Sequence, residues 1–226
     1  MKLETRPGTL LRWAALKTIL NSEIKDDQVI LDAGGYDGFI LNNLRRLNSR
    51  IETIVLDIDE SGLRKAKKRG LEVCLASALK LPIRSCRVDI VLCFDVIEHV
   101  NEDQQLINEV SRVLKEGGKL TLTTPMQHGI SFPFLSRKKN EIINKSWGHV
   151  RSGYSLKDIA KLFKNSGLKI EKLSKYFNLF TRVVYMFCFL SKIPIPGKEL
   201  LYHLAIRLEP YVKYGAEEHI IIGRKG

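Results

Sequence analysis

The chain has 226 residues, of which 44% are hydrophobic, and this is enough to bury a substantial core in one domain spanning residues 1–226. Lys and Arg outnumber Asp and Glu by 37 to 25, so the formal charge of +12 favours anionic partners such as nucleic acid, acidic lipid headgroups or phosphorylated substrates. The four cysteines form no CxxC pair, which argues against zinc ligation and against a disulfide framework. We therefore predict no metal site and a reducing, cytoplasmic location.

Targeting and membrane-spanning segments are not expected. The N-terminal stretch MKLETRPG has no apolar core of the kind found in signal peptides. No stretch approaches the roughly 20 apolar residues of a membrane span.

The hydrophobic pattern alternates between strands and helices. Apolar runs predict strands over residues 29–32, 51–57, 72–76, 88–94, 119–124, 168–176 and 219–223. Amphipathic spacing predicts helices over residues 10–20, 39–47, 61–69, from 101 to the Gly117-Gly118 pair, and 155–167. This alternation predicts an α/β fold in which helices cover both faces of a doubly wound, mostly parallel, seven-stranded sheet.

Two segments depart from the alternation. Residues 126–153 form a long polar stretch, and loops of this length in compact domains tend to be functional, so we predict an active-site loop. Residues 177–218 separate the last two strands and are predicted to form a helical, apolar insertion that acts as a lid.

A glycine-rich turn follows the first strand, with Asp32, Gly34 and Gly38 in D-x-G-x-x-x-G spacing. In a dinucleotide-binding turn a carboxylate at this place would repel the pyrophosphate. Asp32 suits a ligand with an ammonium group and no phosphate, such as S-adenosylmethionine. Asp57, at the end of the next strand, is placed to accept hydrogen bonds from both ribose hydroxyls, although a helix-capping role is the alternative.

Four stretches resemble, in order, the motifs of the class I S-adenosylmethionine-dependent methyltransferases, in the broad group that includes quinone, sugar and natural-product enzymes. They read LDAGGYDG, VLDID, LKLPIRSCRVDIVLCFDVIEHV and VLKEGGKLTLTTP. The resemblance covers roughly residues 25–176 and implies a Rossmann-like fold. It also implies S-adenosylmethionine as the cofactor and a small-molecule or lipid-linked substrate, with O-, N- or C-methylation unresolved.

The resemblance also implies roles for single residues. The methionine part of the cofactor is expected to lie against Asp32, Ala33, Gly34 and Gly38, with Phe94 and Asp95 beneath it. Asp57 is expected to hold the ribose, Ile58 to pack on the adenine, and Ser77, Ala78 and Leu79 to line the adenine edge. Two residues depart from the family pattern, because Tyr36 replaces a frequent glycine and Ser77 replaces a frequent aspartate. If position 36 needs a positive φ, its side chain costs about 1 kcal/mol or more.

Candidate catalytic residues lie after the fourth strand and on the long loop. His99 is a candidate general base, and a structural hydrogen bond at the helix entrance is the alternative. His149 is a second candidate, with a lid-anchoring role as the alternative. His128, Trp147 and Tyr154 are the candidate substrate-binding residues.

Three other functions compete with this reading. Tyr36 and Ser77 are consistent with a cofactor-binding module that has lost catalysis. The basic run from Arg64 to Arg69 raises an RNA methyltransferase, but Phe94-Asp95-Val96 stands where enzymes acting on nucleic-acid bases carry Asn-Pro-Pro or Asp-Pro-Pro, so the sequence does not favour nucleic acid. A nicotinamide-dependent oxidoreductase is disfavoured by Asp32.

The insertion contains eight consecutive apolar residues, Val183 to Leu190. Basic residues surround them at positions 182, 192, 198, 207 and 213, as expected for a segment resting in an anionic membrane interface. One hypothesis is that residues 178–198 contact the membrane surface and admit a lipid-linked acceptor, which would make the protein peripheral to the membrane. A lid helix packed on the sheet and a homodimer contact are the alternatives.

Overall fold

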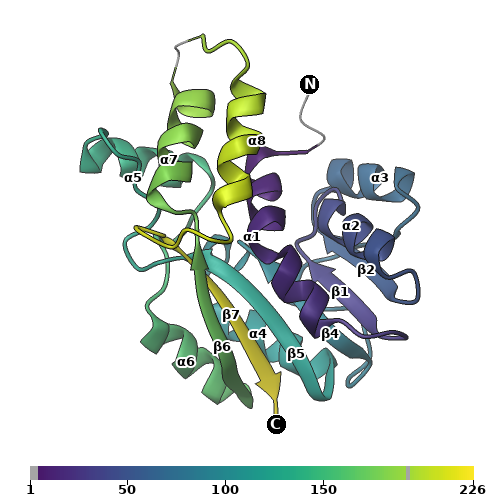
Figure 1. Ribbon diagram of the computed structural model, residues 1–226. Coiled ribbons are helices and arrows are strands. Elements are labelled where there is room, and N and C mark those ends of the chain that lie inside the picture. The colour runs from purple at the N-terminus through teal and green to yellow at the C-terminus, as the bar shows by residue number, and fades with distance from the viewer. Residues whose placement is uncertain (1–4, 192–193) are drawn as a thin grey trace.

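A seven-stranded sheet organises residues 5–191 and 194–226, which are the residues that the computed structural model describes (Figure 1). The strands are β1 (Val29–Ala33), β2 (Glu52–Asp57), β3 (Glu72–Leu75), β4 (Val88–Phe94), β5 (Leu114–Pro125), β6 (Leu168–Tyr176) and β7 (Glu218–Lys225). Their order across the sheet is β3-β2-β1-β4-β5-β7-β6. The strand β7 runs antiparallel to β5 and β6, and the other pairs are parallel. The predicted fold class is confirmed.

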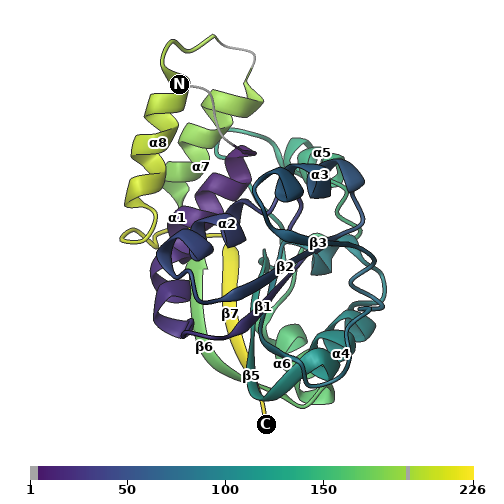
Figure 2. The ribbon, with the colours of Figure 1, turned by 90° about the vertical axis from the view of Figure 1, so that its right-hand side faces the viewer.

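Helices cover both faces of this sheet (Figure 2). They are α1 (Pro7–Glu23), α2 (Phe39–Leu47), α3 (Glu60–Lys68), α4 (Asp103–Val113), α5 (Arg137–Ser146), α6 (Leu156–Asn165), α7 (Leu179–Tyr185) and α8 (Lys198–Leu208). One apolar cluster joins α1, α2 and α3 to one face of the sheet, and a second joins α4 and α6 to the other. Ile30 and Leu31 point to opposite clusters and are both fully buried, which explains the continuous apolar run of β1.

The strands β1 and β4 are neighbours at the centre of the sheet. After β1 the chain continues through α2 on one face, and after β4 it continues through α4 on the other. The sheet therefore changes winding direction between these two strands, and the crevice at their carboxyl ends is where open α/β sheets bind ligands.

The boundary between α4 and β5 differs from the prediction. The helix ends at Val113, and β5 begins at Leu114, which pairs with Val88 on β4. The two glycines that were expected to end the helix lie inside the strand instead. Gly117 has a φ of +75°, and a Cβ on Gly118 would lie 2.8 Å from the Lys115 carbonyl oxygen. Both glycines thus serve an irregularity of the strand, where the register against β4 shifts.

The stretch 126–153 is more ordered than predicted, because it contains the helix α5. The Ser136 hydroxyl accepts a hydrogen bond from the Lys139 amide and caps the helix. Two asparagines on α5 then bind the preceding chain: Asn140 bonds to the backbone of Phe132, and Asn144 to the backbone of Ile130. These polar contacts organise a helix that has too few apolar residues to show an amphipathic pattern.

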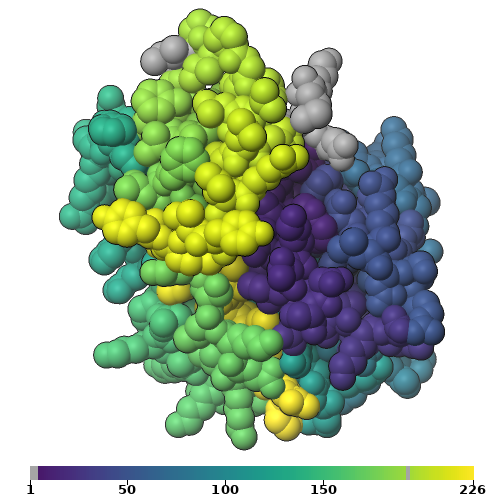
Figure 3. All heavy atoms as spheres, viewed as in Figure 1, coloured from purple at the N-terminus to yellow at the C-terminus, as the bar shows by residue number. Residues whose placement is uncertain are grey.

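The insertion at 177–218 contributes α7, which continues as a π-helical turn at Met186–Leu190, and α8. These two helices lie beside one another, and α8 lies directly against α1 (Figures 1 and 3). The fully buried Tyr202 on α8 donates a hydrogen bond of 2.7 Å to the Pro7 carbonyl oxygen. The insertion is therefore part of the core, and none of the described helices has both the length and the apolarity to cross a bilayer.

Arg182 was expected at the surface of the insertion, but it is buried, with 4% exposure. Its guanidinium lies 2.8 Å from a Glu217 carboxylate oxygen and 2.7 Å from the Gly215 carbonyl oxygen. Lys192 lies outside the described residues.

Candidate functional site

A cavity of about 500 Å³ opens at the carboxyl ends of β1 and β4. The start of α1 and the insertion close its sides, and the loop after α5 forms another wall. Two groups of residues line it. The first comes from the glycine turn and the N-terminal segment: Arg6, Arg12, Asp32, Gly34, Gly35 and Tyr36. The second comes from the chain after β4, the loop after α5 and the insertion: Asp95, Glu98, His99, Trp147, His149 and Tyr185.

Asp32 lies near the end of β1 and is only 3% exposed, yet it lines the cavity. Burial raises the pKa of its carboxyl to about 7, and the carboxylates of Asp57 and Asp37 add to this effect, while Arg12 opposes it. Ala33, the next residue, is fully buried and does not line the cavity. Asp32 is thus a partly ionised carboxyl at neutral pH that faces a ligand-sized space.

Gly34 has a φ of +86°, and a Cβ there would lie 2.3 Å from a Val96 methyl group. We expect Gly34→Ala to destabilise the protein by about 2–5 kcal/mol, because left-handed strain of about 1–2 kcal/mol adds to an overpacking cost of about 1–3 kcal/mol. Urea denaturation would measure this loss. The matched control is Gly167→Ala, since Gly167 has a φ of +73° with nothing within 4 Å of its Cβ position and is expected to show the strain alone. Equal losses in the two variants would contradict the steric argument.

Tyr36 occupies the turn with a φ of +47°. Position 36 thus has the positive φ at which a side chain costs about 1 kcal/mol or more. Its ring fills the space above Gly62 on α3, where a Cβ would lie 2.3 Å from the ring. The Arg6 guanidinium lies 3.6 Å from the ring centroid on the other side. Tyr36 therefore links the glycine turn to α3 and to the N-terminal segment, contacts that a glycine would not make.

Asp57 does not line the cavity. One of its carboxylate oxygens accepts a hydrogen bond of 2.8 Å from the Tyr36 amide, and the other accepts one of 2.8 Å from the Asp59 amide. Each oxygen keeps a second lone pair. The capping role considered for Asp57 belongs to Asp59, whose carboxylate accepts from the Ser61 and Gly62 amides at the start of α3.

Four further predicted cofactor residues lie near the ends of β2 and β3, outside the cavity. Ile58 is 77% exposed, although it is a large apolar residue. Ser77 is exposed, and its hydroxyl accepts a hydrogen bond of 3.2 Å from the Leu79 amide. Ala78 and Leu79 are half-buried. These residues form an open surface that continues from the glycine turn.

Phe94 and Asp95 end β4 and line the cavity. Asp95 has a φ of +52° and forms an ion pair with Arg12. The Thr123 hydroxyl donates to the same carboxylate, and the Tyr176 hydroxyl lies 3.4 Å from it and donates to Glu218. Burial favours a neutral Asp95, but Arg12 and the hydrogen bond from Thr123 hold its pKa below the usual range. Burial and the Asp95 charge raise the pKa of Glu218.

Glu98 and His99 lie on a 3₁₀ turn at Ile97–His99, and His149 approaches them from the loop after α5. The two imidazole centroids are 4.9 Å apart and their planes are nearly perpendicular. Burial and the neighbouring His99 lower the pKa of His149 to about 4, so His149 is neutral at pH 7. Burial and the Asp95 charge raise the pKa of Glu98. Trp147 lies beside His149, with centroids 5.9 Å apart.

Three more predicted site residues, Gly38, His128 and Tyr154, do not line the cavity. A Cβ on Gly38 would lie 2.5 Å from Leu71 and 3.0 Å from Ala66, so its missing side chain lets α2 and α3 pack. His128 is exposed to solvent away from the cavity. Tyr154 is 2% exposed, and its hydroxyl lies 3.1 Å from both the Ile97 carbonyl oxygen and the Asp103 carboxylate. The hydroxyl of Tyr154 thus anchors the chain after β4, and the role of Tyr154 in substrate binding stays a prediction.

Sequence reasoning missed many of the cavity residues, among them Arg12, Tyr176, Tyr185 and Glu218. Arg12 had a detectable signal, because it is a charged residue among the apolar residues of the first helix. The other three belong to strand ends and to the insertion, and their convergence depends on the antiparallel placement of β7.

Parts of the chain are similar in sequence to known proteins. Residues 31–122 match the family described as "Methyltransferase domain". A stretch of 98 residues is 40% identical to an uncharacterised protein of Methanocaldococcus jannaschii, covering 43% of this chain and 41% of that protein. A stretch of 155 residues is 27% identical to a Mycolicibacterium smegmatis protein named "Probable S-adenosylmethionine-dependent methyltransferase", covering 62% of this chain and 56% of that protein. The matched stretches thus span about half the length of these relatives.

Among solved structures, the geranyl diphosphate C-methyltransferase of Streptomyces coelicolor, in complex with Mg²⁺, geranyl diphosphate and S-adenosyl-L-homocysteine, has a TM-score of 0.68. The similarity covers 100% of this chain and 86% of that chain, at 14% sequence identity. At this identity the likeness shows a shared fold.

Proposed function

We propose that the chain is a class I S-adenosylmethionine-dependent methyltransferase that transfers the cofactor's methyl group to a small-molecule or lipid-linked acceptor bound in the cavity, a proposal that its similarity to methyltransferases supports. The observation that carries this proposal is the composition of the cavity. Its β1 side presents a carboxyl and a glycine turn, and its β4 side presents polar groups against an aromatic wall.

The residues of the β1 side fit the cofactor. Asp32 faces the cavity and would hold the ammonium group, while Gly34 lines the cavity with main-chain atoms alone. The free lone pairs of Asp57 would accept from the ribose hydroxyls, and the exposed side chain of Ile58 would pack on the adenine. When bound, S-adenosylmethionine would supply an electrophilic methyl group on a sulfonium.

The other side of the cavity suits an apolar or aromatic acceptor that carries a polar group. Trp147, Phe177 and Tyr185 supply the apolar wall. His99 and His149 face the same space, and a neutral imidazole there can receive a proton from the acceptor. The remaining contribution of the protein is to align the acceptor and exclude water, which in enzymes can lower a barrier by about 7–11 kcal/mol.

The direct test combines binding with turnover. Calorimetry with S-adenosylmethionine and S-adenosylhomocysteine should show binding of both. Incubation with S-adenosylmethionine and a metabolite and lipid extract should yield a species that gains one methyl group by mass spectrometry. Binding without such a product would favour the inactive module, and a methylated product confined to added RNA would favour the RNA methyltransferase.

The helix α8 presents a stripe of leucines to solvent. The exposed fractions of Leu200, Leu201, Leu204 and Leu208 are 63%, 40%, 52% and 48%. Arg207 is exposed on the same helix, and Lys198 begins it. The apolar run that was predicted to contact the membrane, Val183 to Leu190, is buried or half-buried. We propose that the leucine stripe of α8 rests on an anionic lipid surface instead and brings a lipid-linked acceptor to the cavity, whose wall includes Tyr185 of the adjoining α7.

We expect the double variant Leu200→Gln/Leu204→Gln to float less with phosphatidylglycerol vesicles than the unmodified protein, because burial of each leucine contributes about 1.5–3 kcal/mol. Density-gradient flotation measures the difference. The control is Leu47→Gln on α2, a leucine that is 60% exposed and lies on another helix. Unchanged flotation of the double variant would contradict the membrane contact. If the variant also changed from dimer to monomer, the leucine stripe would be a dimer contact instead.

A further inference from the structure

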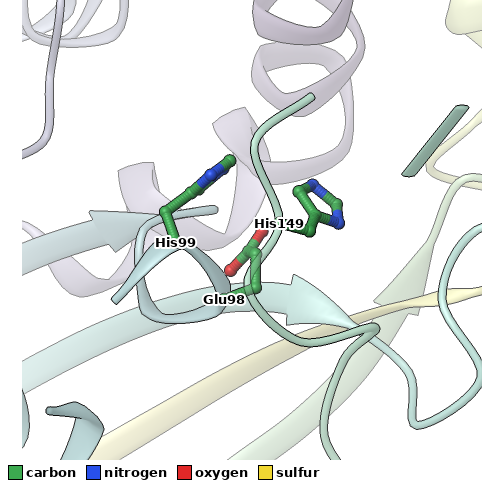
Figure 4. A group of neighbouring side chains, drawn as sticks. All are labelled: Glu98, His99 and His149. Atoms are coloured by element: carbon green, nitrogen blue, oxygen red, sulfur yellow. The ribbon is translucent and has the colours of Figure 1, made fainter. Parts of the chain in front are cut away.

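The side chains of Glu98, His99 and His149 are neighbours, as Figure 4 shows, and all three line the cavity. One potential ligand atom from each lies within 4.8 Å of those of the other two. Two ligand atoms at about 2.0–2.3 Å from one tetrahedral metal ion lie about 3.3–3.8 Å apart, so the three side chains would draw closer together on binding an ion. The cluster joins two segments about fifty residues apart, and all three residues line the cavity.

Two of the polar atoms in this cluster are buried without a hydrogen-bond partner among the described residues. They are the Oε1 atom of Glu98 and the Nδ1 atom of His149. Glu98 is 0% exposed, so water does not reach its carboxyl from outside. Buried acceptors of this kind are rare, because each one loses its hydrogen bonds to water on folding. Their joint position therefore points to a ligand that both atoms bind.

The other polar atoms of the same side chains are already held. The Thr124 hydroxyl donates a hydrogen bond of 3.1 Å to Glu98 Oε2. His99 Nδ1 lies 3.1 Å from the Gly148 carbonyl oxygen, and if it carries the proton, Nε2 remains as the electron-pair donor. A histidine that binds a metal usually donates its second ring N–H to a backbone carbonyl or carboxylate in this way.

The backbone also holds the two segments together. The Glu98 carbonyl oxygen accepts a hydrogen bond of 2.9 Å from the Val150 amide, next to His149. Asp95, the nearest other carboxylate on this wall, is engaged by Arg12 and Thr123 and is not counted among the ligands. The donor set is thus two imidazoles and one carboxylate, with the cavity on its open side.

We propose that Glu98, His99 and His149 bind one first-row transition-metal ion of the Zn²⁺, Mn²⁺, Fe²⁺ or Co²⁺ class at the acceptor side of the cavity. Imidazole ligands favour these ions over Mg²⁺ and Ca²⁺, which prefer oxygen. Three protein ligands leave coordination positions open, as in catalytic sites. The ion would hold a hydroxyl or carboxylate oxygen of the acceptor against the wall; this second step rests on the proposed methyl transfer, whereas metal binding does not.

Metal binding can be tested on the full chain after treatment with a chelator and before any cofactor is added. Addition of Co²⁺ should produce visible d–d absorption that saturates at one ion per chain and disappears when Zn²⁺ displaces it. Each of the variants Glu98→Gln and His149→Ala should lower the Co²⁺ affinity at least about tenfold, because even partners outside the first coordination shell cost about 10–100-fold. The control His128→Ala, an exposed histidine of the same loop, should bind Co²⁺ normally.

Three results would overturn the metal site: no saturable absorption in the unmodified chain, unchanged affinity in His149→Ala, or a loss in His128→Ala equal to that in His149→Ala. Circular dichroism of each variant separates loss of a ligand from loss of fold. If a variant fails to fold, the Co²⁺ titration of the unmodified chain decides whether the metal site exists. Calorimetry with S-adenosylmethionine is run separately, so failure of the proposed function and failure of the metal site give different patterns.

Discussion

Arg12→Met is expected to lower the free energy of unfolding by about 3–5 kcal/mol, because it leaves the Asp95 carboxylate buried without its counter-ion. The side chains of Arg12 and Asp95 are only 16% and 19% exposed. Thr123 and Tyr176 would still contact Asp95, but neither carries a positive charge. Urea denaturation near pH 7, with the midpoint and slope compared between the two proteins, measures the loss.

The pH dependence of this loss follows from the sign of the Asp95 shift. In the unmodified protein the pKa of Asp95 is lowered, so Asp95 contributes stability that is present above its unfolded pKa and is lost as the pH falls. Without Arg12, burial raises that pKa and the contribution changes sign. The difference between the two proteins should therefore shrink in acid. In addition, Asp95→Asn should recover part of the stability when combined with Arg12→Met.

Arg64→Met is the matched control for the Arg12 variant. Arg64 pairs with Glu60 one helical turn away, at 2.8 Å, but its side chain is 73% exposed. Exposed pairs of this kind contribute about 0.3–0.5 kcal/mol. A loss for Arg12→Met no larger than that for Arg64→Met would mean that the buried pair does not stabilise the cavity.

The β1 side of the cavity was predictable because its signals are local. A buried apolar run, a carboxylate at its end and glycines after it lie within ten residues, and Asp32 and Gly34 line the cavity as a consequence. Tyr36 was recognised as an exception, and its positive φ follows from its place in the same turn. Local patterns do not distinguish cavity contact from packing, however, so Gly38 was assigned to the cofactor although it spaces two helices.

The β4 side of the cavity was less predictable because its residues come from distant segments. Arg12 meets Asp95 across 83 residues, and His149 meets Glu98 through a loop with no regular pattern. The same reason explains the error at Arg182, whose partner Glu217 follows it by more than thirty residues. The prediction of no metal site rested on the spacing of the cysteines, and the neighbouring side chains of Glu98, His99 and His149 come from two segments that share no short motif.

Asp32→Asn is expected to weaken S-adenosylmethionine binding by about 10–100-fold at about pH 8, because a hydrogen bond to a charged group contributes about 1.5–3 kcal/mol. The pKa of Asp32 is about 7 in the free protein, so its carboxyl becomes charged as the pH rises through 7. Affinity in the unmodified protein should therefore rise over this range and then level off. At about pH 5.5 the two proteins should bind almost equally well, as measured by calorimetry at each pH.

The same carboxyl should affect stability in the opposite direction. Its pKa rises from 3.8 to about 7 on folding, so its stabilising contribution is fully present below about pH 4 and is lost as the pH rises through 7. The shift of about three units corresponds to at most about 4 kcal/mol. Asp32→Asn should abolish this decline, making the free variant more stable than the unmodified protein at pH 8 while it binds the cofactor less well.

Asp26→Asn, which alters an exposed ion pair with Arg50, should change neither property. Cofactor affinity that is independent of pH, together with equal stability of the two proteins at pH 8, would show that Asp32 neither binds the ammonium group nor carries a buried charge.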